Sequence, residues 1–472
     1  MNLVVSVGEW AVLTYFLVLH GVYLALNALA YVSISRSTLR RFGESAPIDR
    51  AFMPPVTILI PAYNEQLGIV DSVRSVLQLT YPAYEVVVIN DGSSDGTFSA
   101  LEQAFDLEPY LEAYREQVVT ARPRGFYVSR RYPNLRVIDK DNGGRADALN
   151  VGVNVARHPL FCTIDADSVL LRDSIDRVVR PFLEDESVIA SGGTVRIANG
   201  CDVREGFMER VSLPDPMLLR FQVVEYLRAF LFGRVGWASF NGLLVLSGAF
   251  GTFRREVVLE AGGFRPDTIG EDMELVVRLH RLMRKQRRRY RIAYVPDPIC
   301  FTEAPDTVEG LKKQRIRWQR GLGESLALNR GLMFRGGVGW LSYPFHLVFE
   351  MYGPMFEIAG YLLAVLAWTS GAISGTTMLA FVFVSFGLGL AFSASALVLE
   401  EMSFNVYPSG RDLARLMVAA VAENFGYRQL NAYWRMVGMV QHVLGREATW
   451  GVIERRGMGG STERAGVSSR SD

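Results

Sequence analysis

Residues 56–65 read VTILIPAYNE, and this stretch gives the first indication of the fold. A continuous apolar run ends at Pro61 and passes directly into the polar residues Tyr63, Asn64 and Glu65. A short apolar run without polar alternation is typical of a strand that is buried on both faces of a parallel sheet. We therefore predict a buried strand whose carboxyl end opens into a polar loop.

The same pattern returns further along the chain. Apolar runs lie at residues 86–89, 135–140 and 159–167, and stretches with a helical pattern, such as 68–79 and 146–156, lie between the runs. Strands that alternate with helices predict an α/β fold with a mainly parallel sheet. Because ligands of such sheets bind beyond the carboxyl ends of the strands, the candidate site residues are Asn64, Glu65, Asp91, Asp95, Asp165 and Asp167.

The composition limits the classes of function. The 472 residues exceed the size of one ordinary domain, so at least two units are expected. Lys and Arg number 50 against 49 Asp and Glu, a net charge of +1 that disfavours a nucleic-acid partner. Hydrophobic residues make up 49% of the chain, which indicates membrane spans. The three cysteines are far apart and match no metal-binding spacing, as expected for reduced residues of a cytosolic domain.

Residues 11–33 are apolar over a length that can cross a bilayer. No Lys or Arg precedes this run, whereas Arg36, Arg40 and Arg41 follow it. A cleaved signal peptide carries its positive charge in front of the apolar run, so we interpret the segment as an anchor. Positive charge collects on the cytoplasmic side, which places the residues after Arg36 in the cytoplasm.

Two further spans are predicted at residues 340–370 and 376–399. The stretch 413–444 is interrupted by charged residues and could be interfacial, re-entrant or a helical hairpin. Glu350 and Glu357 lie within the predicted span at 340–370, where they would either form buried hydrogen bonds or line an acceptor path. The expected organisation is an anchor (1–36), a cytoplasmic catalytic domain with an interfacial helix near 307–330 (54–336), C-terminal transmembrane or interfacial helices (338–445), and a disordered cytoplasmic tail (446–472).

Charged residues at the ends of predicted strands and the starts of predicted helices are candidates for binding a metal ion or a phosphate, or for catalysis. Asp165 and Asp167 end an apolar run one residue apart, and such carboxylates can hold Mg²⁺ beside a diphosphate. Asp91 lies in NDGSSDGT, either a plain turn or a contact to a nucleobase or ribose. Arg145 opens a predicted helix, where a guanidinium can meet phosphate. Asp272 also begins a predicted helix, either as dipole compensation or as a general base.

Six motifs occur in order: PAYNE, NDGSSDGT, GGRADALN, DADS, GEDMEL and QRIRW. Together they resemble the family 2 glycosyltransferases with a GT-A fold, and specifically the membrane-integrated processive branch that makes cellulose, chitin, hyaluronan and poly-N-acetylglucosamine. The resemblance covers residues from about 56 to 321. It implies a GT-A domain that uses a UDP-sugar donor, a glycan acceptor and Mg²⁺ or Mn²⁺ at the plasma membrane, and it allows accessory export subunits.

The resemblance also implies roles for particular residues. Tyr63, Glu65 and Asp91 would contact the uridine, and Asp165 would face the diphosphate. The remaining roles would be a metal ligand (Asp167), a catalytic base (Asp272), a phosphate contact (Arg145), and acceptor or diphosphate contacts (Gln314, Arg317 and Trp318).

Two residues depart from the family pattern. Arg145 replaces the usual lysine, which keeps the charge but changes its geometry. Gly270 replaces the usual threonine before Glu271 and Asp272. The gating-loop motif and cyclic-nucleotide sensor of cellulose synthases are not recognisable in the sequence, so a smaller relative is expected.

Residues 311–321 read LKKQRIRWQRG, and one face of the predicted helix carries Gln314, Arg317 and Trp318 at spacing i, i+3 and i+4. We expect this face to point to the acceptor and the diphosphate. The other basic residues are expected largely on the remaining faces, toward the membrane surface: Lys312, Lys313, Arg315 and Arg320.

The sequence favours an inverting enzyme that extends a β-linked polysaccharide. The alternatives are a non-processive enzyme that acts on a lipid-linked or short acceptor, and an inactive membrane subunit that guides a polymer. A transporter fits poorly, because most of the chain is an α/β unit with few spans.

Overall fold

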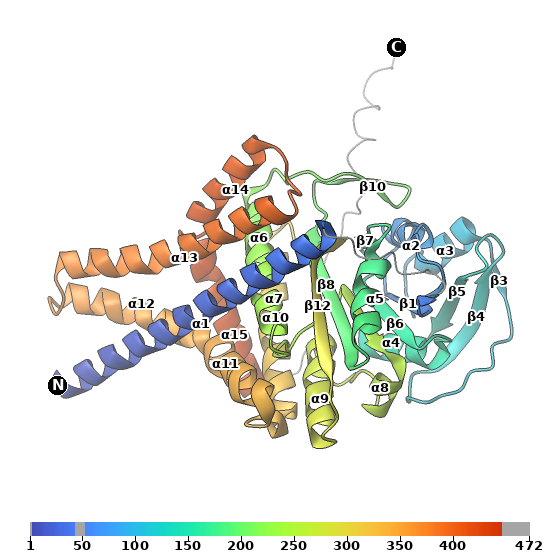
Figure 1. Ribbon diagram of the computed structural model, residues 1–472, viewed down its shortest axis with the longest axis horizontal. Coiled ribbons are helices and arrows are strands. Elements are labelled where there is room, and N and C mark those ends of the chain that lie inside the picture. The colour runs from blue at the N-terminus through green and yellow to red at the C-terminus, as the bar shows by residue number, and fades with distance from the viewer. Residues whose placement is uncertain (1, 43–51, 446–472) are drawn as a thin grey trace, which may run out of the picture.

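The computed structural model describes residues 2–42 and 52–445, so the predicted tail at 446–472 lies outside the described residues. An α/β layer forms one side of the molecule, and long helices extend from it on the other side (Figure 1). The chain enters through one of these helices, passes through the α/β layer and returns to the helices near its end.

Within the described residues, ten strands form one sheet. In spatial order they are β3 (Leu107–Pro109), β4 (Pro123–Ser129), β5 (Leu135–Lys140), β2 (Tyr84–Asp91), β1 (Val56–Ala62), β6 (Leu160–Ile164), β11 (Phe250–Arg254), β8 (Val188–Ile197), β12 (Arg291–Thr302) and β7 (Ser168–Leu170). A separate antiparallel hairpin joins β9 (Asp202–Arg204) to β10 (Phe207–Arg210).

The four predicted strands are confirmed as β1, β2, β5 and β6, and they run parallel at the centre of the sheet. The sheet as a whole is mixed, because β11 lies antiparallel between β6 and β8 and because β3, β4 and β7 also pair antiparallel. Every residue of β1 is buried, as expected for a strand that is covered on both faces.

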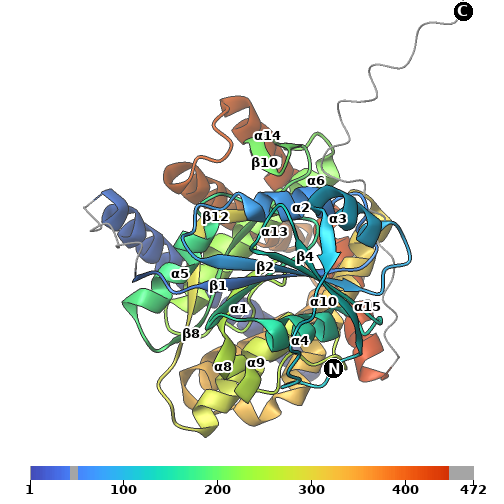
Figure 2. The same ribbon diagram turned by 90° about the vertical axis from the view of Figure 1, so that its right-hand side faces the viewer.

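Helices cover both faces of the sheet (Figure 2). One face packs against α2 (Ile69–Leu77), α3 (Thr97–Phe105) and α5 (Ser174–Glu184). The other packs against α4 (Arg145–Val155), α8 (Arg255–Glu260) and α9 (Glu271–Lys285). Alternate residues of each strand divide between the two cores: Ile58 and Ile60 pack on the first, and Leu59 packs on the second.

Long apolar helices make up much of the other side of the molecule. They are α1 (Asn2–Phe42), α12 (Gly353–Thr369) and α13 (Gly375–Ser403). By length and composition, Thr14–Arg36 and Phe386–Ser403 could each cross a membrane. Val338–Met351 and Gly353–Thr369 pass the same test together but are bent by 45°, so the predicted span at 340–370 is broken near Tyr352. Pro354 follows the break, and proline cannot donate the backbone hydrogen bond that a continuous helix needs.

The remaining helices outside the α/β layer join the two sides. They are α6 (Met217–Leu227), η2 (Arg228–Arg234), α7 (Val235–Ala238), α10 (Val308–Leu328), η3 (Arg330–Leu332), η4 (Val338–Ser342), α11 (Tyr343–Phe345), η5 (His346–Met351), α14 (Gly410–Ala422) and α15 (Tyr427–Val443). The stretch 413–444, left open by the sequence, thus forms two helices, of which α14 packs on α6 and α15 packs along α10.

Candidate active site

A cavity of about 3630 Å³ lies where the carboxyl ends of β1, β2 and β6 face α9 and α10. It continues between the helices as far as α1, α12 and α13. All of the sequence-predicted site residues line this one cavity, although they come from distant parts of the chain: Tyr63, Glu65, Asp91, Arg145, Asp165, Asp167, Asp272, Gln314, Arg317 and Trp318.

Tyr63 and Glu65 lie in the loop after β1. The side chain of Tyr63 is 49% exposed, so its ring is open to a ligand. The side chain of Thr97 accepts a 2.8 Å hydrogen bond from the backbone N–H of Glu65. Asn64, between Tyr63 and Glu65, adopts a positive φ of 56°. Asparagine tolerates this left-handed conformation better than most residues. The loop is therefore fixed against the start of α3.

Asp91, at the end of β2, is buried and fully bonded. Its carboxylate accepts hydrogen bonds from the backbone N–H groups of Gly143 (3.0 Å) and Gly144 (2.8 Å) and forms an ion pair with buried Lys140. Lys140 also contacts Asp147 at 2.7 Å. Asp91 thus holds the glycine turn that precedes Arg145.

Arg145 joins three parts of the site. Its Nη2 donates hydrogen bonds to Oδ1 of Asp165 and to the backbone oxygen of Gly248, both at 2.7 Å, and its Nη1 pairs with Glu271. Burial lowers the pKa of Arg145, but the carboxylates of Asp165 and Glu271 more than offset this and hold it above its ordinary value. The planar guanidinium can reach all three partners at once, which a lysine ammonium could not do with the same geometry.

Asp272 lies in the first turn of α9. The N–H of Gly248 donates a 2.9 Å hydrogen bond to its Oδ2, and the N–H of Met273 donates one of 2.8 Å to its Oδ1. Two backbone donors fix the carboxylate in one orientation while it lines the cavity. A positioned carboxylate of this kind can accept a proton from a hydroxyl that enters the cavity.

Gly270 has a structural reason to be glycine. A Cβ atom at this position would lie 3.0 Å from Cα of Gly321, so the start of α9 and the middle of α10 meet backbone to backbone. The threonine that the family pattern has here would not fit this contact without a shift of one helix.

Asp165 and Asp167 follow β6 at the cavity wall. Asp165 is 32% exposed, whereas Asp167 is 9% exposed and accepts a 3.1 Å hydrogen bond from Thr302. Among the described residues, no group of three or more His, Cys, Asp or Glu could hold a metal ion. Mg²⁺ is usually held by one or two carboxylates together with substrate phosphates, so this pair fits a metal that binds with a diphosphate.

Gln314, Arg317 and Trp318 line the cavity along α10. The indole of Trp318 is 45% exposed, and Gln314 is buried. Burial lowers the pKa of Arg317, and Glu271 and Asp165 act in the opposite direction. All three residues therefore line the cavity, together with other residues of α10 such as Arg315 and Gln319, and the prediction that their face points to the acceptor and the diphosphate stays a prediction.

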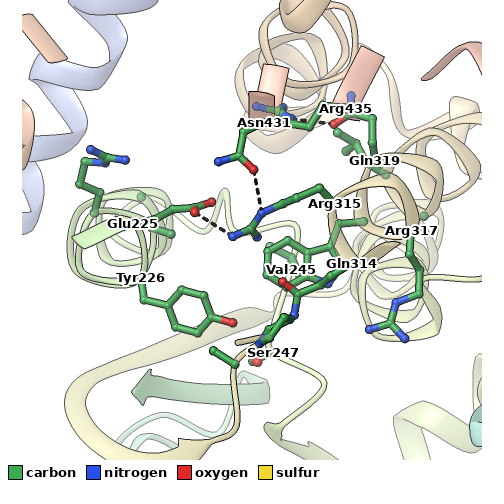
Figure 3. Close-up of a pocket in the computed structure, with 18 of the residues that line it drawn as sticks. Glu225, Tyr226, Val245, Ser247, Gln314, Arg315, Arg317, Gln319, Asn431 and Arg435 are labelled. Atoms are coloured by element: carbon green, nitrogen blue, oxygen red, sulfur yellow. Dashed lines mark hydrogen bonds and ion pairs between the residues drawn. The ribbon is translucent and has the colours of Figure 1, made fainter. Parts of the chain in front are cut away.

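The prediction that Arg315 and Arg320 face the membrane surface is wrong. Both are buried, at 2% and 8% exposure. Arg315 points between α6 and α15, where it donates hydrogen bonds to Glu225 at 2.7 Å and to Asn431 at 3.2 Å (Figure 3). Its guanidinium also lies 4.4 Å from the centre of the Trp318 ring, so it supports the indole from one side.

Sequence reasoning missed several residues of the site. Glu271 has no predicted role of its own beside Asp272, yet it is buried and pairs with Arg145. Lys140 ends a predicted strand, and a lysine at the end of a buried run is a local signal for an ion pair with a neighbouring carboxylate. Glu225 and Asn431 carry no local signal, because each meets Arg315 from a helix far away in the sequence.

Glu350 and Glu357 both line the part of the cavity between the long helices. Glu350 accepts hydrogen bonds from Tyr23 at 2.7 Å and Arg435 at 2.9 Å, and Glu357 accepts one of 2.8 Å from Tyr361. Both alternatives that the sequence left open are therefore compatible: the carboxylates are hydrogen-bonded, and they also line the cavity.

Residues 54–321 match the family described as glycosyltransferase like family 2. The chain is 27% identical over 311 residues to a poly-β-1,6-N-acetyl-D-glucosamine synthase of Staphylococcus aureus (strain COL), which covers 65% of this chain and 64% of that protein. A synthase of the same name from Staphylococcus epidermidis is 25% identical over 310 residues, covering 66% and 64%. The chain thus matches less than two thirds of the length of these relatives.

Among solved structures, the chain is similar to a mannosyltransferase from Pyrobaculum calidifontis in complex with GDP-Man and Mn²⁺. The TM-score is 0.49 at 19% sequence identity, and the match covers 91% of this chain and 100% of that one.

Proposed function

Because the chain belongs to the glycosyltransferase-like family 2, we propose that it is a membrane-bound inverting enzyme that transfers sugars from a UDP-sugar to a growing β-linked polysaccharide. One observation carries the proposal: the bonded carboxylates and the exposed indole of Trp318 line one cavity that continues into the long apolar helices. A donor site, a proton acceptor and a surface for a sugar ring are thus held together.

In this proposal the donor binds at the strand ends. Tyr63, Glu65 and Asp91 serve the uridine side, with Asp91 acting through the glycine turn that it holds. Arg145 and Asp165 lie on the diphosphate side. Asp165 and Asp167 would hold Mg²⁺ or Mn²⁺, and the bound metal would supply charge neutralisation to the diphosphate.

The acceptor approaches from the side of α10. Asp272 takes the proton of the acceptor hydroxyl, whose oxygen forms a bond to the anomeric carbon of the donor. The bond between that carbon and the diphosphate oxygen breaks at the same time, and UDP leaves with its electron pair. Arg317 stabilises the charge on the leaving diphosphate. Attack from the opposite face inverts the configuration, so an α-linked donor gives a β-linked product.

Three features support a polymer as the product. Trp318 offers an exposed aromatic face to the terminal sugar ring. Gln314 and Arg317 lie within one helical turn of it on α10 and line the same cavity. The cavity then extends past Glu350 and Glu357 toward the long helices, which gives an elongating chain a route away from the site. The curated relatives are named for a polymer of N-acetylglucosamine, so UDP-N-acetylglucosamine is the first donor to test.

We further propose a multi-pass location in the plasma membrane, with the catalytic domain in the cytoplasm. The apolar segments Thr14–Arg36 and Phe386–Ser403 support the spans, and the positive charges that follow the first span support the orientation. The proposed partners include accessory export subunits. Nucleic acid is not a proposed partner.

A donor screen tests the proposed function. Purified full-length protein in lipid nanodiscs is supplied with UDP-glucose, UDP-N-acetylglucosamine, UDP-galactose or UDP-glucuronic acid, with and without Mn²⁺ or Mg²⁺. We expect metal-dependent UDP release from one donor, with products many sugars long. Products extended by a single sugar would replace the processive enzyme with the non-processive one. UDP release from none of the donors would favour the inactive subunit.

A further inference from the structure

The exposed side of α14 changes from basic to apolar along its length. Arg411 and Arg415 lie one turn apart near its start, and Val418 follows on the same face. Toward the end of the helix, Val418 and Val421 are 58% and 44% exposed, and Phe425 beyond it is 70% exposed. A surface with cations at one end and exposed apolar side chains at the other has the polarity of an amphiphile.

A small hollow that is open to solvent, called the basic cavity here, lies at the basic end of this surface. Its volume is about 250 Å³, and its lining combines three arginines with two apolar residues: Arg220 of α6 and Arg411, Ala414, Arg415 and Val418 of α14. Arg220 is held in place because its Nε donates a 2.9 Å hydrogen bond to the backbone oxygen of Pro214. The arginines therefore converge on one space from two helices.

The neighbouring carboxylates compensate this positive charge only in part. Asp215 lies 3.5 Å from Arg220 and 3.9 Å from Arg415, but its side chain is 89% exposed. Asp412 contacts Arg415 at 3.6 Å. Single ion pairs that stay in contact with solvent contribute little, and in the part of the chain that the structure describes these two carboxylates face three guanidinium groups. An oxyanion that offers two oxygens to a guanidinium fork would bind in preference to them.

The position of α14 next to a candidate membrane span indicates that the bound anion is a lipid headgroup. The candidate span in α13 ends at Ser403, and α14 begins at Gly410 and packs against α13 (Figure 1). The opposite side of α14 is buried through Leu416, Ala419 and Ala420. The basic cavity therefore lies beside the end of a span, where phospholipid headgroups are found.

We propose that Arg220, Arg411 and Arg415 bind the phosphate of an anionic glycerophospholipid, whose acyl chains lie along the apolar side of α14. The basic cavity takes the headgroup, and Val418, Val421 and Phe425 contact the chains. This site is separate from the catalytic cavity and does not depend on which sugar is transferred.

Native mass spectrometry of the full-length protein tests the site. The protein is reconstituted with equal amounts of phosphatidylglycerol and phosphatidylcholine, and the lipids that stay bound after release are counted. We expect the wild type to retain phosphatidylglycerol over phosphatidylcholine by about 100-fold, because each of the three arginines adds roughly a factor of 5 near a membrane surface. The double variant Arg411→Gln/Arg415→Gln keeps only Arg220 and should lower this preference to about 5-fold.

The matched control is Arg131→Gln/Arg289→Gln, which removes two exposed arginines outside α6 and α14 and should keep the preference. The thermal midpoint of each variant checks that it is folded. A preference that stays close to the wild-type value in the Arg411/Arg415 variant, or that falls equally in the control, overturns the proposal. Displacement of phosphatidylglycerol by an excess of inorganic phosphate would make the ligand a free anion instead of a lipid, and would also overturn it.

Discussion

The two walls of the cavity are held in different ways. One wall, called the strand wall here, combines the ends of β2 and β6 with the first turns of α4 and α9. Backbone N–H groups of Gly143, Gly144, Gly248 and Met273 fix its carboxylates Asp91 and Asp272, and the side chain of Arg145 holds Asp165. In the helix wall, made of Gln314, Arg317 and Trp318, position depends on how α10 packs against its neighbours. Arg315, which supports Trp318, is held by side chains of α6 and α15.

From this difference we infer that the strand wall serves the chemical step and the helix wall serves binding and movement of the product. Fixed carboxylates that need no rearrangement suit the chemical step, because a preorganised group costs little to place at the moment of reaction. An exposed indole suits a sugar ring that must bind and then move on. Changes in the strand wall should therefore lower the rate, whereas changes in the helix wall should alter the length of the product.

The largest effect is expected for Asp272→Asn. The amide keeps the size of the side chain but cannot take the acceptor proton, so sugar transfer should fall by about 10³-fold. Incorporation of radiolabelled sugar into product measures this. Asp267→Asn is the matched control, because Asp267 lies a few residues earlier, is 61% exposed, and forms only a surface pair with Arg265. Transfer by Asp272→Asn within a factor of a few of the wild type would remove Asp272 as the base.

Arg145→Lys should have the next largest effect. A lysine can keep the charge near Asp165 but cannot bond Glu271 and Gly248 at the same time, so we expect kcat to fall by about 10- to 100-fold. Steady-state kinetics with the preferred donor measures the loss. Arg265→Lys breaks a comparable fork on the surface and should leave kcat unchanged. If both variants behave alike, the strand wall does not depend on the arginine fork.

Trp318→Ala tests the helix wall. Removal of the indole should shorten the products markedly, while UDP release falls by less than about 10-fold, because one stacked aromatic contributes on the order of 1 kcal/mol beyond its buried area. Trp318→Phe should restore much of the length. Gel analysis of product size, with Trp340→Ala as an exposed aromatic control, separates the outcomes. A wild-type length distribution in Trp318→Ala would contradict the division between the walls.

The smallest effect is expected where the walls meet. Gly270→Ala places a methyl group 3.0 Å from Cα of Gly321 and should lower the free energy of unfolding by about 1–3 kcal/mol. Thermal denaturation measures the shift. A Cβ at Gly337 would meet nothing within 4 Å, so Gly337→Ala serves as the control and should be close to neutral. Equal midpoints for the two variants would show that the contact between α9 and α10 tolerates extra volume.

The same contrast explains what the sequence could predict. Asp165 and Asp167 could be placed at a ligand-binding edge because a buried apolar run ends just before them. Gln314, Arg317 and Trp318 could be placed on one face because helical spacing is local. In both cases the signal lies within ten residues or so of chain.

Features that depend on distant partners could not be predicted in this way. Arg315 carries the pattern of a solvated cation, and it is buried because Glu225, 90 residues away, and Asn431, 116 residues away, meet it. The antiparallel insertion of β11 between β6 and β8 likewise depends on pairing between remote segments. The break near Tyr352 lies inside a stretch that is hydrophobic enough to be taken as one span, and Pro354 is the local residue that accompanies it.

The most direct test of the central claim is the anomeric configuration of the first bond formed. Full-length protein is given UDP-N-acetylglucosamine, or the donor that the screen identifies, and the new anomeric proton is observed by NMR during the reaction. We expect a β-linked product from the α-linked donor, formed by the wild type and lost in Asp272→Asn. An α-linked product would contradict a single displacement with Asp272 as the base.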